Sequence, residues 1–200
     1  MPSRNQQNTT PLRTIKDFKS KLIGGGARPN LFEVELAFPD GEGSPVAVNE
    51  VVENARFLVK AAALPASTIA AIEIPFRGRI LKIAGERTFE TWTITIMNDS
   101  TFSIRSAFEK WMNYINKLDD ATGVTDPVLY QKDAVVKQLD RDGRVLRKYK
   151  FWDIFPTNIS SIDLNYESRD AIEEFTVEMQ VHYWEALKGD APLAGGEDIR

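Results

Sequence analysis

Few side chains in this chain of 200 residues have the type and spacing that catalysis requires. The sequence contains no cysteine and a single histidine, His182. The lack of cysteine excludes thiolate nucleophiles, disulfides and cysteine-ligated metals, and one histidine cannot form a histidine-rich metal site. A Ser-His-Asp triad would have to use His182, which falls on the polar side of an alternating segment. The pattern therefore favours a structural role for His182 over a catalytic one.

Three other motifs are better explained by backbone structure than by chemistry. Gly24-Gly25-Gly26 lacks the Gly-Lys-Ser/Thr ending of a phosphate-binding loop and predicts a flexible joint. Residues 140–143 (Asp-Arg-Asp-Gly) lack the remaining ligands of a calcium loop and predict a hairpin turn. Glu173 and Glu174 are adjacent, so in a strand they face opposite sides and cannot form a catalytic pair. The sequence gives no reason to expect an enzyme, a cofactor or a metal site.

The charges are distributed unevenly. The net charge is −4, but residues 1–30 carry six basic and one acidic side chain, which leaves −9 on the rest. A basic arm on an acidic body suits docking on a neighbouring copy, although a solvated tail explains the same charges. Nucleic acid is a weaker alternative, because the arm lacks interleaved aromatic residues and the body would repel phosphates. We divide the chain into a basic arm (1–26), a β domain (27–185) and a flexible tail (186–200).

The apolar pattern predicts mainly strands. Expected strands are 31–38, 55–62, 72–76 paired with 79–83, 91–97, 134–139 paired with 144–154, and 159–164 paired with 174–184. A short helix is expected over 14–23 and a loop over 39–50. One long amphipathic helix over 101–118, capped by Asp99 or Ser100, is expected from a single stripe formed by Ile104, Phe108, Trp111, Ile115 and Leu118. These elements predict two packed antiparallel sheets, a sandwich or partial barrel, with one long helix.

The sequence predicts neither a membrane-spanning helix nor a signal peptide. No run of about 18 apolar residues occurs, which predicts no membrane-spanning helix. The first ten residues are polar and contain no apolar signal-peptide core, which predicts synthesis in the cytoplasm.

The segment 174–184 indicates assembly. Phe175, Val177 and Met179 share its apolar face, and its other face is polar and rich in acid. A long strand with a complete polar face suits a sheet whose one side borders water. Neighbouring subunits in a ring would cover the open edges of such a sheet. A monomeric sandwich with one solvated face fits the same periodicity.

Five ordered segments resemble one known family. They are 27–32 (Ala-Arg-Pro-Asn-Leu-Phe), Lys60 with 63–65 (Ala-Leu-Pro), 84–89 (Ala-Gly-Glu-Arg-Thr-Phe) with Trp92 and 97–99 (Met-Asn-Asp), 155–159 (Phe-Pro-Thr-Asn-Ile), and 183–185 (Tyr-Trp-Glu). Together they are similar to the tail tube proteins of contractile-tailed (myovirus-type) bacteriophages, over about residues 27–185. Segment 1–26 is longer than is usual for this family, and loop 39–51 and tail 186–200 look like additions to the family pattern.

The resemblance implies a structural, non-enzymatic protein of the virion, made in the host cytoplasm. It implies hexameric rings stacked into a hollow tube within a contractile sheath, through which genomic DNA passes without specific binding. The other implied partners are a tape-measure protein and baseplate and tail-terminator proteins. A baseplate tube-initiator, or the inner tube protein of a phage-derived contractile secretion or injection system, would share the fold. A small ligand-binding or enzymatic β-barrel is the alternative from another class, but the sequence shows no convergent polar pocket.

Two sets of residues are the candidate functional sites under this interpretation. Glu174 and Glu178 are expected to face the lumen, where a weakly repulsive acidic wall would let DNA slide. Contacts between successive rings are expected to use the basic side chains of the arm, namely Arg13, Lys16, Lys19 and Lys21.

Overall fold

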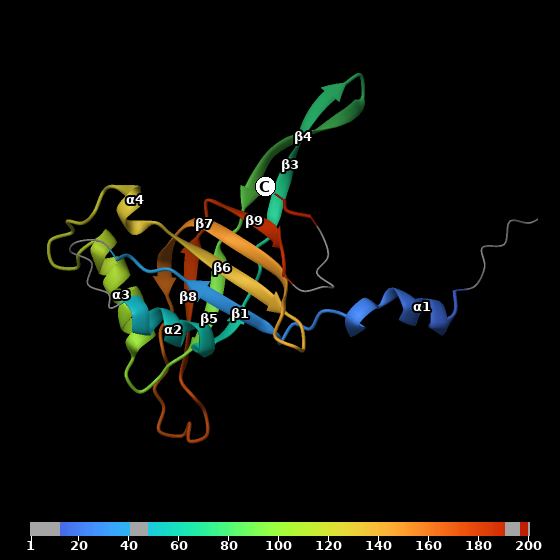
Figure 1. The fold of residues 1–200 in the computed structure, drawn as a ribbon. Helices are drawn as coiled ribbons and strands as arrows, with labels where there is room; N and C mark the ends of the chain where they lie inside the picture. The colour runs from blue at the N-terminus through green and yellow to red at the C-terminus, as the bar shows by residue number, and fades with distance from the viewer. Residues whose placement is uncertain (1–12, 41–47, 191–196, 200) are drawn as a thin grey trace, which may run out of the picture.

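The computed structural model describes residues 13–40, 48–190 and 197–199, and it shows a β-rich body from which a hairpin, a loop and the N-terminal helix project (Figure 1). The helices are α1 (Ile15–Lys21), the 3-10 turn η1 (Ile23–Gly25), α2 (Val48–Leu58), α3 (Ser103–Ile115) and α4 (Pro127–Tyr130). The strands are β1 (Phe32–Leu36), β2 (Val59–Ala62), β3 (Ser67–Phe76), β4 (Arg79–Phe89), β5 (Trp92–Met97), β6 (Lys132–Leu139), β7 (Val145–Ile159), β8 (Glu174–Gln180) and β9 (Tyr183–Lys188).

Strand β7 belongs to both sheets of the body. Its first part pairs with β6 and β9, and β6 pairs with β1, which makes the first sheet. Its last part pairs with β8, which pairs with β5 and then β2, and this makes the second sheet. All these pairings are antiparallel. Among the described strands β1 and β2 end the path without pairing to each other, so the body is two antiparallel sheets joined by one strand and not a closed barrel.

The two sheets are joined where two neighbouring strands change the face that they bury. In β7 the buried positions shift from odd to even numbers between Phe151 and Ile154, around Asp153, whose φ is 54°. The chain from β8 to β9 makes the same change after Val181, and the His182 N–H donates to the Trp152 carbonyl at 3.2 Å. Because side chains alternate along a strand, one extra residue exchanges the inner and outer faces.

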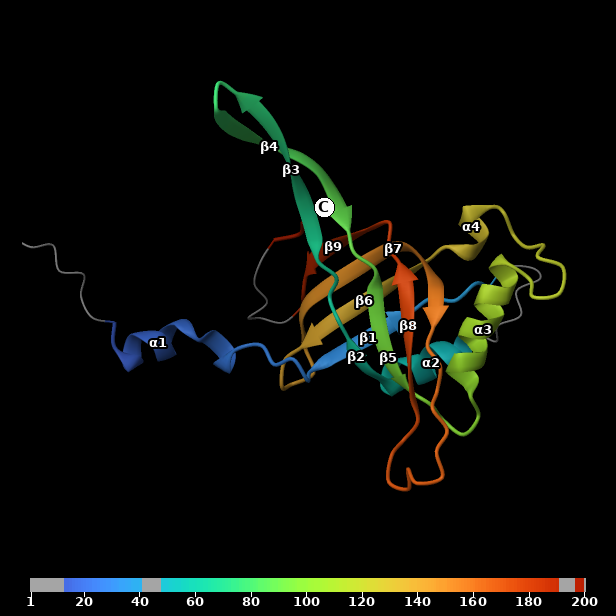
Figure 2. The same cartoon turned by 180° about the vertical axis from the view of Figure 1, so that it is seen from behind.

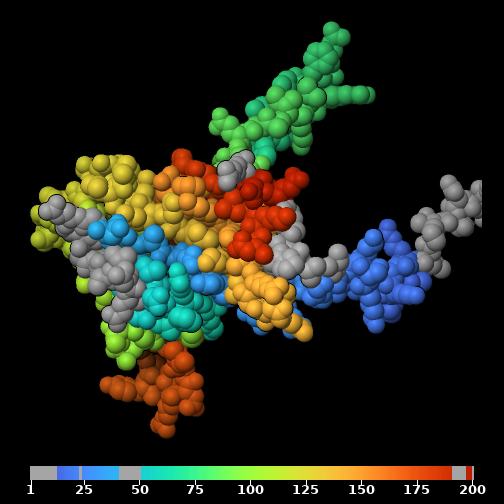
Figure 3. All heavy atoms as spheres, in the orientation of Figure 1, coloured from blue at the N-terminus to red at the C-terminus, as the bar shows by residue number. Residues whose placement is uncertain are grey.

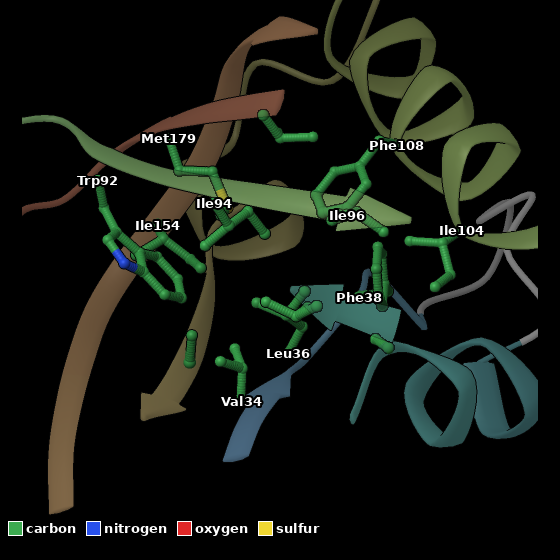
Figure 4. Close-up of a cluster of buried hydrophobic side chains, with 14 of the residues drawn as sticks. Val34, Leu36, Phe38, Trp92, Ile94, Ile96, Ile104, Phe108, Ile154 and Met179 are labelled. Atoms are coloured by element: carbon green, nitrogen blue, oxygen red, sulfur yellow. The ribbon is translucent and has the colours of Figure 1, made fainter. Parts of the chain in front are cut away.

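The core lies between the sheets and beneath α3 (Figure 4). Each contributing strand buries alternate residues, as an antiparallel sheet with one solvated face requires. The fully buried residues include Val34 and Leu36 of β1, Trp92, Ile94 and Ile96 of β5, Phe175, Val177 and Met179 of β8, and Ile104, Phe108 and Trp111 of α3. The predicted strand 91–97 and the predicted core stripe of the long helix are therefore confirmed, apart from Leu118, which is 95% exposed beyond the end of α3.

The N-cap of α3 is Phe102, with a left-handed backbone, and not Asp99 or Ser100 as expected. Asp99 still stabilises the start of the helix, because its carboxylate accepts a hydrogen bond from the Ser103 N–H at 3.2 Å. Hydrogen bonds from the Thr101 hydroxyl and from Ser103 hold the pKa of Asp99 below its usual value. A carboxylate near the first turn also interacts favourably with the helix dipole.

Helix α2 corrects the expectation of a loop over 39–50 and a strand over 55–62. Residues 48–58 are helical and only 59–62 are extended, while 41–47 lie outside the described residues. Val51 and Ala55 are buried one helical turn apart, and Val59, the first residue of β2, continues the buried side. Arg56 of α2 forms an ion pair with Glu35 of β1 at 3.0 Å, so the helix is tied to the edge of the first sheet.

Two other expectations about the C-terminal region are wrong. Residues 160–164 are not a strand, because the partner of β8 is the end of β7, and 160–173 form a loop. The single strand expected over 174–184 is divided into β8 and β9, which lie in different sheets. β9 continues to Lys188, and Ala186 pairs with Ile199, so part of the expected tail belongs to the first sheet. The division into arm, domain and tail stays a prediction.

Candidate assembly surfaces

The β3–β4 hairpin projects from the body and pairs only with itself (Figures 1 and 2). This confirms the predicted pairing of 72–76 with 79–83 across Arg77-Gly78, and extends it to 67–89. Gly78 has a φ of 81° at the tip, a conformation that glycine adopts without strain. An isolated two-stranded ribbon is marginally stable in water, so this hairpin is suited to being covered by another surface.

One face of the hairpin is apolar and has no cover. Ile72 lies opposite Ile83 and Ile74 opposite Leu81, and Phe76 follows on the same face. These five side chains, which we call the hairpin face, are between 42% and 66% exposed. The opposite face carries Glu73 and Lys82, which form an ion pair at 3.0 Å, and also Pro75 opposite Ile80, which is 59% exposed. The hairpin face is therefore the more continuous apolar side of a hairpin that is exposed on both sides in the single subunit.

The sequence-based candidates did not include the hairpin face. Its signal is visible in retrospect, because Ile72, Ile74 and Phe76 alternate with small or charged residues, as in any half-buried strand. Alternation predicts that one face is apolar. It does not distinguish a face covered by the same chain from one that is left open for a partner.

The polar face of the second sheet contains both predicted acidic residues. Glu178 lies in register between Asn158 of β7 and Thr93 of β5. Glu174 lies at the other end of β8, where its carboxylate pairs with the Lys60 ammonium of β2 at 2.6 Å. No lysine or arginine of the described residues forms an ion pair with Glu178. The two glutamates therefore share one sheet face, but only Glu178 contributes an uncompensated charge to it.

The four basic candidates of the arm lie on and beside α1. Thr14 begins this helix with a capping box, in which its hydroxyl accepts from the Asp17 N–H at 3.3 Å and its own N–H donates to the Asp17 carboxylate at 2.9 Å. The hydrogen bond from the Thr14 backbone N–H, and to a lesser extent the one from its hydroxyl, hold the pKa of Asp17 below its usual value. Lys16, Lys19 and Lys21 lie within α1, and Arg13 precedes it. The structure brings these cations together on one short helix, but it does not place them against a partner.

The loop 160–173 projects from the opposite end of the body to the hairpin (Figure 3). Its base is fixed, because the Ser160 N–H donates to the Thr176 carbonyl and the Ser160 hydroxyl accepts from the Thr176 N–H, each at 2.9 Å. The loop lines an open groove of about 750 Å³, together with Glu174. Apolar and acidic side chains both contribute to this groove.

Nothing in the described residues is arranged for catalysis or for metal binding. His182 is exposed, between the ends of β8 and β9. Glu173 accepts a hydrogen bond from the Asn98 amide at 3.1 Å, while Glu174 pairs with Lys60, so the two glutamates have separate partners. Residues 140–143 form the turn between β6 and β7, as predicted. Within residues 13–40, 48–190 and 197–199, no group of three or more potential metal ligands occurs, and no helix is long and apolar enough to cross a membrane.

Comparison with known proteins identifies the family. The family model for the phage tail tube protein matches residues 27–187. The chain belongs to this family. It is 33% identical to Tail tube protein gp19 of Enterobacteria phage T4 and 34% identical to that of Enterobacteria phage T6, in each case over 163 residues that cover 81% of this chain and 93% of the relative. The resemblance noted in the sequence is confirmed, and the chain is a tail tube protein, a structural component of the phage tail.

Solved structures confirm the tail tube fold. A chain of the PVC sheath-tube complex, from an extracellular contractile injection system in its extended state, superposes with a TM-score of 0.56 at 12% identity, covering 84% of this chain and 95% of that chain. At this identity the similarity shows the fold alone. The family model matches from residue 27 onward, so α1 and its basic side chains precede the residues that this model matches.

Proposed function

We propose that identical copies of this tail tube protein close into six-membered rings, that the rings stack into a hollow tube, and that genomic DNA enters the host through this tube when a surrounding sheath contracts. The observation that carries the proposal is the uncovered hairpin face on a subunit of the tail tube family. Burying apolar surface is favourable by roughly 25 cal/mol per Å², so this face provides a driving force for association.

The position of the hairpin favours a repeating contact. It projects from one end of the body (Figure 1), and in a ring or a stack, where copies are related by rotation or translation, its face meets a different surface of the next copy. Contacts between unlike surfaces generate closed rings or open filaments. A tube of stacked rings combines both arrangements, because each ring is closed and the stack of rings is open at its ends.

The polar face of the second sheet is our candidate for the lumen wall. Threonine and asparagine side chains surround Glu178 there, and Lys60 neutralises Glu174. Such a wall has few cations to bind phosphates, because each lysine or arginine contact would hold DNA and release counterions. A nearly neutral, weakly acidic wall suits passage of DNA without specific binding.

The partners follow from the same proposal. We expect the outside of the tube to contact the contractile sheath, its ends to contact baseplate and tail-terminator proteins, and its lumen to hold a tape-measure protein during assembly. No catalytic role is proposed. The baseplate initiator and the inner tube of a secretion or injection system remain alternatives of the same fold, but 33–34% identity to phage tail tube proteins favours the phage tube.

Electron microscopy of the purified full chain tests the proposal. We expect hollow tubes of uniform diameter in negative stain, either on concentration or after addition of baseplates as seeds. Absence of rings and tubes in both experiments would contradict the proposed assembly.

The lumen assignment predicts an effect of charge on DNA ejection. We expect phage carrying Glu178→Lys to assemble normally but to eject DNA several-fold more slowly at low salt, because six new cations per ring would attract phosphates. The difference should shrink above about 0.1 M salt, where the Debye length falls below about 10 Å. Ejection kinetics measured by release of a DNA-binding dye would show the change.

Asp142→Lys is the matched control, because Asp142 is an exposed acid in the β6–β7 turn, away from the polar sheet face. It changes the net charge equally and should leave ejection unchanged. Equal rates for Glu178→Lys and the unmodified phage would remove Glu178 from the lumen.

A further inference from the structure

The helix α1 has an uncovered apolar stripe bordered by cations. Ile15, Phe18 and Leu22 recur at a spacing of three and four residues and are 76%, 67% and 47% exposed. Residues 13–22 contain four basic side chains and one acidic, a net charge of +3. Among the described residues, the hydrogen bonds of this segment stay within 14–25, and both views show α1 standing clear of the body (Figures 1 and 2). The described residues of the same subunit therefore leave this amphipathic helix without a surface to pack against.

The loop 160–173 has the opposite charge and the same kind of exposed apolar surface. It contains four acidic side chains and one basic, a net charge of −3. Leu164, Tyr166 and Ile172 are 87%, 104% and 67% exposed. They line the groove of about 750 Å³ beside Asp163 and Glu173. This groove, which apolar and acidic side chains line together, is complementary in charge and in apolar character to a basic helix with an apolar stripe.

The geometry points to a second copy as the owner of the groove. The arm leaves the body near the β6–β7 turn, where the Leu139 N–H donates to the Leu31 carbonyl at 2.9 Å. The loop 160–173 leaves from the other end of β7, and in both views α1 extends away from it (Figures 1 and 2). Three glycines follow α1, with φ of 68°, 79° and 82° at Gly24, Gly25 and Gly26. Because glycine adopts many backbone conformations, they allow α1 to change its orientation relative to β1.

We infer that α1 of one subunit docks in the groove of loop 160–173 of a second copy, with its apolar stripe on Leu164 and Ile172 and its lysines on the acidic side chains of the loop. This inference rests on the proposed self-assembly and names the contact surface of a segment that precedes the family match. The arm would then link subunits in addition to the hairpin face, and a link of this kind raises the effective concentration of the remaining contacts.

Cysteine cross-linking tests the contact directly, because the natural chain has no cysteine. One full-length protein carries Lys19→Cys, at the border of the apolar stripe, and a second protein of different mass carries Ser168→Cys in the groove. The two are mixed, assembled and mildly oxidised. A disulfide between them can form only between two chains, so it reports docking in a second copy.

We expect a covalent heterodimer at a yield roughly tenfold above that of a control pair, since docked cysteines meet at millimolar effective concentration. In the control pair Val128→Cys replaces Ser168→Cys, because Val128 is 79% exposed on α4, away from the loop. The yield should fall at high salt, as the Debye length shortens. A yield equal to that of the control pair would overturn the inference, and so would arm-dependent binding of DNA without the cross-link.

Microscopy of the same samples separates this inference from the proposed function. Tubes without the specific cross-link would refute the docking of α1 and leave the tube intact. Samples with neither rings, tubes nor cross-link would contradict both.

Discussion

The double substitution Ile74→Thr and Leu81→Thr is expected to give a folded protein that forms no tubes at concentrations where the natural chain does. These two residues lie opposite each other at the centre of the hairpin face, and they are 42% and 59% exposed. Threonine keeps a high strand propensity while it replaces apolar by polar surface. The hairpin should therefore form as before and lose its ability to associate.

The size of the effect follows from the surface that association buries. Two large aliphatic side chains contribute about 2–3 kcal/mol when their exposed surface is buried. Every subunit of the polymer makes the contact, so the critical concentration for growth should rise roughly 30- to 150-fold. Light scattering during concentration, followed by negative-stain microscopy, measures this shift.

The opposite face of the same hairpin provides the control. Glu73→Thr with Lys82→Thr removes an exposed ion pair and places the same residue type one position away on each strand. Exposed ion pairs contribute little to stability, so this variant should form tubes like the natural chain. Normal tubes from the first variant, or equal loss in both, would show that the hairpin face is not the association surface.

Trp111→Ala is expected to destabilise the subunit by about 3–5 kcal/mol, the range for removing a large buried aromatic side chain. Trp111 is fully buried in α3, with its ring centroid 5.6 Å from that of Phe38 and 6.1 Å from that of Phe108. Its indole N–H donates to the Tyr130 carbonyl at 2.8 Å and so joins α3 to α4. Trp111→Phe should cost less, about 1–3 kcal/mol, because it keeps a ring and loses the hydrogen bond.

Urea unfolding measures these losses, and the Ile74→Thr and Leu81→Thr protein is the suitable background because it should remain monomeric. The control is Leu118→Ala. The sequence places Leu118 on the same stripe as Trp111, but the structure leaves it 95% exposed, so its truncation should change stability by less than about 0.5 kcal/mol. A large effect at Leu118, or a small one at Trp111, would contradict the observed end of α3.

Periodicity predicted the elements whose surroundings are simple. The strand 91–97 is covered on one face and open on the other, so its alternation translates directly into burial. The apolar stripe of α3 packs against the sheet, so its helical spacing predicts its buried residues equally well. Helix α2 was missed, because its buried Val51 and Ala55 sit among polar residues and the extended segment that follows continues the apolar run. A short apolar run cannot separate helix from strand without knowledge of what it packs against.

The change of face at Asp153 and after Val181 was also invisible in the sequence. Residues 174–184 alternate without interruption, yet Val181 is buried and Tyr183 is 38% exposed. The position at which buried and exposed residues change places is determined by pairing with β7, whose two parts pair with β8 and with β9. Similarly, the sequence places Glu174 and Glu178 on one strand face, but the neutralising Lys60 comes from a strand 114 residues away. A local sequence pattern cannot predict an ion pair between residues that only the topology of the fold brings together.

The one-sided projection of the β3–β4 hairpin has a consequence for growth (Figure 1). A tube in which this contact joins each ring to the next is polar: subunits at one end present unoccupied hairpins, and those at the other end present only the surface that receives them. The two ends therefore differ chemically, like the plus and minus ends of a cytoskeletal filament, and need not elongate at the same rate. A protein that caps one end cannot cap the other by the same contact, so initiation and termination of such a tube require two different complementary surfaces.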